Sequence, residues 1–158
     1  IRLAALQVKR ATQAARLLVV VDYLQIVPTE EQHRDPRNRV DAVVSDLRRL
    51  ARDLDAAVVA VSAVGRASYD RPTLAAFKES GGVEYGADLG AGMWREKDAP
   101  KGQDTFKGIT GRQWKRVKLD IVKNRNGEKS RIEFDFFPQV SAFVEKSKSS
   151  LPDEDPDA

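Results

Sequence analysis

One acidic residue ends an aliphatic run near the start of the chain, and its position gives it a chemical use. Five consecutive branched aliphatics, Leu17–Val21, are typical of a strand buried on both faces, as in a parallel sheet with helices on either side. Asp22 follows at the end of this strand. In open α/β sheets ligands bind beyond the carboxyl ends of the strands, so a carboxylate there can meet a metal ion or a phosphate. A buried strand whose aspartate merely begins a turn explains these residues equally well.

The composition narrows the class of protein. A length of 158 residues allows one domain with a substantial core and is too short to predict two. The absence of cysteine excludes disulfides and thiolate metal sites, which fits a reducing compartment. The single histidine, His33, lies in a polar segment, and we interpret it as a solvated loop residue. No stretch is long and apolar enough to span a membrane and no signal peptide is recognisable, so we expect a soluble, cytoplasmic protein without a membrane partner.

The charge is unevenly distributed along the chain. The net charge is +3, yet the last seven residues, Pro152–Ala158, carry four acids and no base. The remaining residues are therefore more basic than the total indicates. Such a balance permits a polyanionic partner, although a solvated basic surface explains it as well.

Helical and strand patterns alternate through the first part of the chain. Apolar residues recur at helical spacing over Ile1–Ala15 and again over Arg39–Leu54. The polar segment Thr29–Asn38 contains Pro36, so it predicts a loop. Ala56–Ser62 predicts a second buried strand. Strand, helix and strand together predict a parallel pair with a right-handed crossover.

The middle of the chain is less regular. Thr73–Ser80 predicts a short helix that ends at Gly81 and Gly82. Leu89–Trp94 is the only apolar run there that is available for a strand, although its glycines weaken that prediction. Glu96–Gln113 is rich in Lys, Gly and Asp and lacks periodicity, which predicts a loop without regular structure.

A hairpin is predicted near the C-terminus. Strands over Arg116–Lys123 and Arg131–Phe137 are joined by Asn124–Gly127, and Asn-Gly is a strong hairpin signal. In the second strand, Ile132, Phe134 and Phe136 are expected to point inward, and Glu133 and Asp135 outward. Ser141–Val144 is expected to form a short edge strand. Residues 146–158 are expected to be a disordered acidic tail behind a single domain of residues 1–145.

Three spaced motifs occur in one order along the chain. They are Asp22-Tyr23-Leu24-Gln25 after the aliphatic strand, the segment Lys78–Asp88, and Lys123-Asn124-Arg125-Asn126-Gly127. Together they resemble the RecA-like ATPase domain of DnaB-type replicative DNA helicases, and the resemblance covers roughly residues 17–144. It implies an α/β, RecA-like fold with a mainly parallel sheet flanked by helices and a C-terminal antiparallel hairpin.

The resemblance implies roles around ATP. Asp22 would be the Walker B acid, which holds the water shell of the Mg²⁺ bound to the nucleotide, and Ser62 would lie beside the nucleotide. Lys123 and Arg125 would reach into the neighbouring subunit's ATP site, where two cations beside the γ-phosphate stabilise the transition state, as an arginine finger does. If the other motifs are set aside, a solvated hairpin turn is the simpler explanation of this basic pair.

A second set of residues resembles a DNA-binding segment. Lys78, Glu79 and Gly81 match an Arg-Glu-Ser-Gly segment that in the family contacts the backbone of single-stranded DNA in the channel of the ring. A lysine can replace the arginine as a point charge for phosphate, without its bidentate fork. Gly81 would let the protein backbone approach a phosphate closely. A helix end with a glycine cap accounts for the same residues.

Two departures from the family pattern bear on activity. Ala63 stands where family members commonly have a glutamine that senses the γ-phosphate, and alanine cannot make that hydrogen bond. No Gly-x-x-x-x-Gly-Lys-Ser/Thr phosphate loop occurs in the 158 residues. We therefore expect the chain alone not to bind ATP appreciably and to be inactive as an enzyme.

Two hypotheses follow. In the first, the chain is the C-terminal part of a longer helicase that forms a ring, expected to be a hexamer. That parent would hydrolyse ATP with Mg²⁺ at subunit interfaces, move along single-stranded DNA and unwind duplex. In the second, it is a non-catalytic RecA-like module that binds DNA or a helicase subunit.

Overall fold

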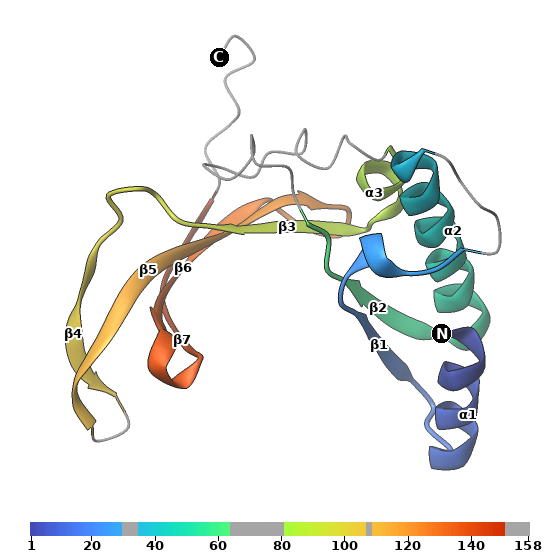
Figure 1. Cartoon of the computed structure of the whole chain (residues 1–158), viewed down its shortest axis with the longest axis horizontal. Coiled ribbons are helices and arrows are strands. Elements are labelled where there is room, and N and C mark those ends of the chain that lie inside the picture. Colours follow the sequence, from blue (N-terminus) through green and yellow to red (C-terminus); the bar gives the residue numbers. More distant parts are fainter. Residues whose placement is uncertain (30–34, 64–80, 107–108, 151–158) are drawn as a thin grey trace, which may run out of the picture. The chain divides into compact units, whose positions relative to one another are not determined.

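The computed structural model describes residues 1–29, 35–63, 81–106 and 109–150 (Figure 1). The described residues form two compact units. The first contains residues up to 63 together with residues 81–87, and the second contains residues 88–150. None of the helices in this described part combines the length and apolar character needed to cross a membrane.

The first unit is built on a parallel pair of strands. Its elements, in chain order, are α1 (Arg2–Thr12), β1 (Leu17–Val21), a short 3-10 turn (Leu24–Ile26), α2 (Pro36–Leu54), β2 (Ala56–Ala60) and α3 (Gly81–Gly86). Strands β1 and β2 are parallel, with Leu17 opposite Ala56 and Val21 opposite Ala60. The predicted succession of strand, helix and parallel strand is confirmed.

Helix α2 begins three residues earlier than its apolar periodicity predicts. Asp35 caps it, because its carboxylate accepts a hydrogen bond from the backbone N–H of Arg37 at 2.9 Å. Pro36 occupies the first turn, where its missing N–H has no intrahelical partner to lose. The predicted loop Thr29–Asn38 is therefore wrong for its last three residues, since this proline starts a helix. His33 lies outside the described residues.

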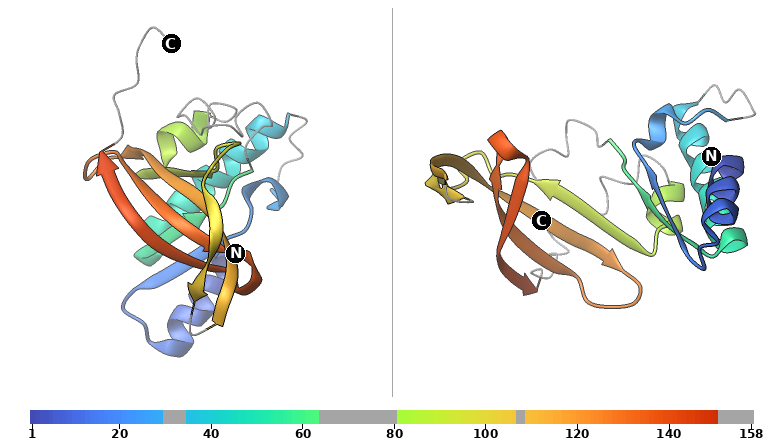
Figure 2. Two further views of the ribbon diagram at one scale, coloured as in Figure 1. Left: turned by 90° about the vertical axis from the view of Figure 1, so that its left-hand side faces the viewer. Right: turned by 90° about the horizontal axis from the view of Figure 1, so that it is seen from below.

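Within the described part of the chain, only one face of the parallel pair is covered (Figure 2, right). Helices α1 and α2 pack on the face that carries Val19 and Val58, and the buried side chains there are Ala5, Val21, Leu24, Val40, Val43, Leu47, Leu50 and Leu54. On the opposite face Leu18 and Val20 are each 62% exposed. The prediction that β1 is buried on both faces is therefore wrong, because α1 and α2, as described, pack on the same side of it.

Helix α3 packs closely against α2. The predicted helix Thr73–Ser80 lies outside the described residues, but Gly81 and Gly82, expected to end it, belong to α3. A Cβ atom at Gly86 would lie 2.8 Å from Cγ1 of Val44, so any larger residue would force one of the two helices or the Val44 side chain to shift.

The second unit is a five-stranded antiparallel sheet. Its strands are β3 (Leu89–Trp94), β4 (Lys101–Phe106), β5 (Ile109–Asn124), β6 (Ser130–Phe137) and β7 (Ala142–Ser150). The strand order is β3-β5-β6-β7, and β4 also pairs with β5. The strand predicted over Leu89–Trp94 and the hairpin joining β5 to β6 are both confirmed.

Two predicted irregular segments are strands instead. Glu96–Gln113 contains β4 and the start of β5, which pair in register from Lys101 opposite Lys115. The predicted tail from residue 146 is wrong for residues 146–150, because β7 continues through them alongside β6. In both places, pairing with a neighbouring strand provides hydrogen-bond partners for the backbone N–H and C=O groups, whatever the local composition.

The two faces of the antiparallel sheet differ in chemistry. One face carries Phe134 and Phe136 of β6, against which Phe143 packs, with ring centroids 6.1 Å and 4.5 Å away. The opposite face carries Glu133 and Asp135, as the alternation predicts. However, Asp135 does not point outward into solvent, because only 4% of it is exposed.

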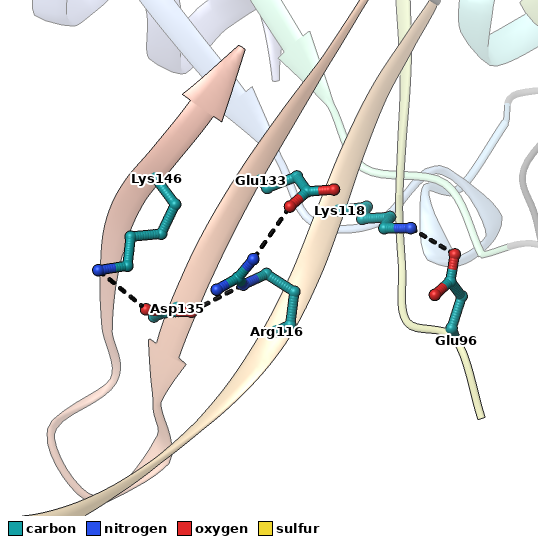
Figure 3. Close-up of polar contacts among 6 residues, drawn as sticks. All are labelled: Glu96, Arg116, Lys118, Glu133, Asp135 and Lys146. Carbon is teal, nitrogen blue, oxygen red and sulfur yellow. Dashed lines mark hydrogen bonds and ion pairs between the residues drawn. The ribbon is translucent and has the colours of Figure 1, made fainter. Parts of the chain in front are cut away.

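Arginine side chains neutralise this charged face (Figure 3). Nε of Arg116 donates to Asp135 at 2.8 Å and its Nη1 to Glu133 at 3.0 Å, while Nζ of Lys146 lies 3.4 Å from Asp135. Arg131 donates two hydrogen bonds to Asp120, at 2.7 and 2.8 Å, and only 1% of Asp120 is exposed. Hydrogen bonds to these carboxylates raise the pKa of both arginines, although burial opposes the shift.

Candidate functional site

Asp22 lies at the carboxyl edge of the parallel pair. Beyond the last strand residues, the backbone N–H of Val61 donates to the carbonyl of Val21, and that of Leu24 donates to the carbonyl of Val61, both at 2.9 Å. These bonds place the segments that carry Asp22 and Ser62 side by side at one edge. Asp22 is exposed and Ser62 is half-buried. Asp22 and Ser62, the two residues predicted to face the nucleotide, therefore follow neighbouring strands at the same edge of the sheet.

Gln25 joins these two strand ends, a role that sequence reasoning missed. Its Nε2 donates to Oγ of Ser62 at 3.0 Å and to the carbonyl of Ala63 at 3.2 Å. Its Oε1 accepts from the backbone N–H of Ala63 at 3.2 Å. The side-chain amide of Gln25 thus binds both backbone groups of Ala63, whose own side chain cannot form a hydrogen bond. The only available signal was its place in the motif that begins at Asp22.

The carboxyl edge suits a magnesium ion that keeps most of its water. No group of three or more His, Cys, Asp or Glu side chains among the described residues could hold a metal on its own. Mg²⁺ with nucleotide needs few carboxylates, because waters and phosphates complete its shell. An exposed Asp22 at the carboxyl end of β1 therefore fits an outer position around such an ion.

The hairpin between β5 and β6 carries the two predicted cations. Lys123 pairs with Gly90 in the ladder to β3, and Arg125 lies in the turn. The side chain of Asn124 shapes this turn, because its Oδ1 accepts from the N–H of Asn126 and its Nδ2 donates to the carbonyl of Glu128, both at 3.2 Å. The turn is thus internally braced.

Arg125 is also hydrogen-bonded to the residue that immediately precedes β3. Its Nη1 donates to Oδ1 of Asp88 at 2.7 Å, and its backbone N–H donates to the carbonyl of Asp88 at 2.9 Å. Asp88 is the last residue of the motif Lys78–Asp88, and its sequence position alone does not predict this contact with Arg125.

The predicted DNA-binding residues are described only in part. Lys78 and Glu79 lie outside the described residues, and Gly81 is in α3. The DNA contact therefore stays a prediction.

The fold is that of a RecA-like ATPase domain. The structure matches a solved ATPase domain with a TM-score of 0.77 and 25% sequence identity, covering 92% of this chain and 50% of the other. It also matches the solved structure of a DnaB-like replicative helicase, described together with its interactions with primase. That match has a TM-score of 0.76 and 25% sequence identity, and it covers 90% of this chain and 34% of the other.

The sequence identifies the family within this class. Residues 1–145 match the family model of the DnaB-like helicase C terminal domain. The chain therefore belongs to the DnaB-like helicase C-terminal domain family.

Curated relatives agree with this assignment. The chain is 30% identical over 131 residues to the replicative DNA helicase DnaB of Treponema pallidum, covering 82% of this chain and 26% of the relative. It is 28% identical over 132 residues to the replicative DNA helicase DnaB of Geobacillus stearothermophilus, and that match covers 80% of this chain and 27% of the relative. The chain thus spans about a quarter of the length of these relatives.

Proposed function

We propose that this chain supplies the C-terminal part of the ATPase domain of a replicative helicase. In a ring, expected to be a hexamer, the complete protein would hydrolyse ATP at subunit interfaces to move along single-stranded DNA and unwind duplex. The observation that carries the proposal is that the strand ends bearing Asp22 and Ser62 lie side by side at the carboxyl edge of the parallel pair. Ligands of open α/β sheets bind at this edge. The complete protein would act in the cytoplasm.

The two groups of residues would serve different ATP molecules. Asp22 would hold Mg²⁺ through water on its own subunit's nucleotide, and the ion would supply charge neutralisation at the phosphates. Ser62, oriented by Gln25, would face the same nucleotide. Lys123 and Arg125 would present their charges to the γ-phosphate bound by the neighbouring subunit.

The exposed apolar face of β1 and β2 supports a larger assembly. Leu18, Val20 and Val59 are each more than half exposed, and such patches mark surfaces that pack against other protein segments. The phosphate loop absent from these 158 residues would have to come from such a segment. A non-catalytic module would have no evident use for Asp22, Lys123 and Arg125.

A nucleotide titration tests the first half of the proposal. The isolated chain should show no ATP binding at micromolar concentration, because it lacks the backbone amides and lysine that hold phosphates. Micromolar binding would contradict the proposal.

An exchange experiment tests the second half. Replacing the matching segment of Geobacillus stearothermophilus DnaB by this chain should retain DNA-stimulated ATP hydrolysis, and Asp22→Asn should remove most of it. A folded chimera that forms rings without hydrolysing ATP would favour the non-catalytic module. The departure at Ala63 is the specific observation on that side.

The DNA contact has its own test. Binding of this chain to single-stranded DNA should weaken steeply with salt and lose affinity on Lys78→Ala, because phosphate contacts release counterions. Fluorescence anisotropy with a labelled oligonucleotide measures both. Unchanged affinity would remove Lys78 from the interface.

A further inference from the structure

We propose that Asp88 positions the side chain of Arg125 for its encounter with the neighbouring subunit's nucleotide. The inference rests on the function proposed above. Two hydrogen bonds join these residues, one from the guanidinium to the carboxylate at 2.7 Å and one between the backbones at 2.9 Å. Asp88 therefore holds both the main chain and the charged end of the same arginine.

Stability does not explain this pair. The side chain of Asp88 is 75% exposed and that of Arg125 is 45% exposed. Ion pairs so accessible to water contribute little to folding free energy. The turn is braced separately by Asn124, whose contacts to Asn126 and Glu128 do not involve Asp88. Removing the carboxylate should therefore leave the hairpin folded.

Orientation explains the pair better. A free arginine side chain samples many rotamers, and ordering it at the moment of reaction lowers the fraction of productive encounters. Five N–H donors in a planar fork let one guanidinium bridge two anions. Asp88 can thus keep hold of Arg125 while the arginine approaches a phosphate. Asp88 acts only through Arg125, so it is a positioning residue.

The order of the arginine side chain can be measured directly in this chain. The ¹⁵N heteronuclear NOE of the Arg125 Nε–Hε group should be high in the wild type and fall in Asp88→Asn, while the backbone NOEs of β3 and β5 stay the same. Asp88→Glu should restore part of the loss. Glu96→Gln is the matched control, because it removes another exposed carboxylate, the partner of Lys118, from the segment that follows β3. An unchanged Arg125 signal in Asp88→Asn would overturn the proposal.

A measurement of ATP hydrolysis distinguishes the positioning role of Asp88 from the direct role of Arg125. In the Geobacillus chimera, Asp88→Asn should lower kcat about tenfold with KM nearly unchanged, whereas Arg125→Ala should lower kcat about a thousandfold. Faster hydrolysis in Asp88→Asn would overturn positioning, because the carboxylate would then be restraining the arginine. If the chimera does not hydrolyse ATP at all, the proposed function fails, while the NMR measurement still decides whether Asp88 orders Arg125.

Discussion

The parallel pair β1–β2 and the antiparallel sheet β3–β7 bury different kinds of side chain. In the first unit the buried side chains are aliphatic and lie on one face of the strands, against α1 and α2. In the second, the carboxylates Asp120 and Asp135 are among the least exposed side chains, each held by an arginine. Loss of an aliphatic group removes buried apolar area, but loss of an arginine takes the opposite charge and its hydrogen bonds away from a buried carboxylate. The same number of deleted atoms should therefore have different consequences in the two units.

The largest effect is expected for Arg131→Met. It removes both hydrogen bonds that Arg131 donates to the buried carboxylate of Asp120, and breaking a buried ion pair costs about 3 kcal/mol or more. Urea unfolding followed by tryptophan fluorescence measures it, because Trp94 and Trp114 both lie in the second unit. Lys146→Met is the control and should cost less than about 1 kcal/mol, because Arg116 continues to hold Asp135. Equal costs would mean that water compensates Asp120.

Neighbouring valines of β1 test the one-sided burial of the first unit. Val21→Ala should cost about 2 kcal/mol, because Val21 is 7% exposed and lies in the aliphatic cluster. Val20→Ala should change the free energy of unfolding by less than about 0.5 kcal/mol, because Val20 faces solvent. Far-UV circular dichroism during urea unfolding compares the two. A similar loss in both variants would show that the outer face is covered in solution.

A smaller effect is expected where α3 meets α2. Gly86→Ala should cost about 1 kcal/mol, because the new Cβ collides with Val44 and packed side chains yield only in part. Val44→Ala should relieve the collision, so the double variant should be more stable than the sum of the single effects predicts. Urea unfolding of the two single variants and the double variant measures this coupling. Strict additivity would show that the helix moves aside at no cost.

The smallest effect concerns pH. The folded-state pKa of Arg131 is raised by its hydrogen bonds to Asp120. The stabilisation from such a shift is fully present below the unfolded-state pKa of arginine and is lost only as pH rises through the folded-state value. The cost of Arg131→Met should therefore be the same at pH 7 and pH 9. A clear change between these two values would point to another titrating group.

Local signals predicted much of the scaffold. The aliphatic run before Asp22, the apolar periodicity of α2 and the Asn-Gly turn each depend on residues close together in the chain. Strand β4 was missed because it has no alternation of its own and is stabilised by pairing with β5. The burial of Asp135 was missed because it depends on Arg116, which lies on another strand.

The sequence by itself determined that an acid follows an aliphatic strand, that two cations occupy a hairpin, and that a phosphate loop is absent from these residues. Only the tertiary structure decided that Gln25 holds Ala63 and that Asp88 holds Arg125, contacts that span 38 and 37 residues of sequence. It also decided that one face of the acid-bearing strand stays exposed. The physical reason is common to all three. The local sequence pattern predicts which face of a strand or helix a side chain lies on. The residue that it contacts depends on the element that the fold places opposite that face.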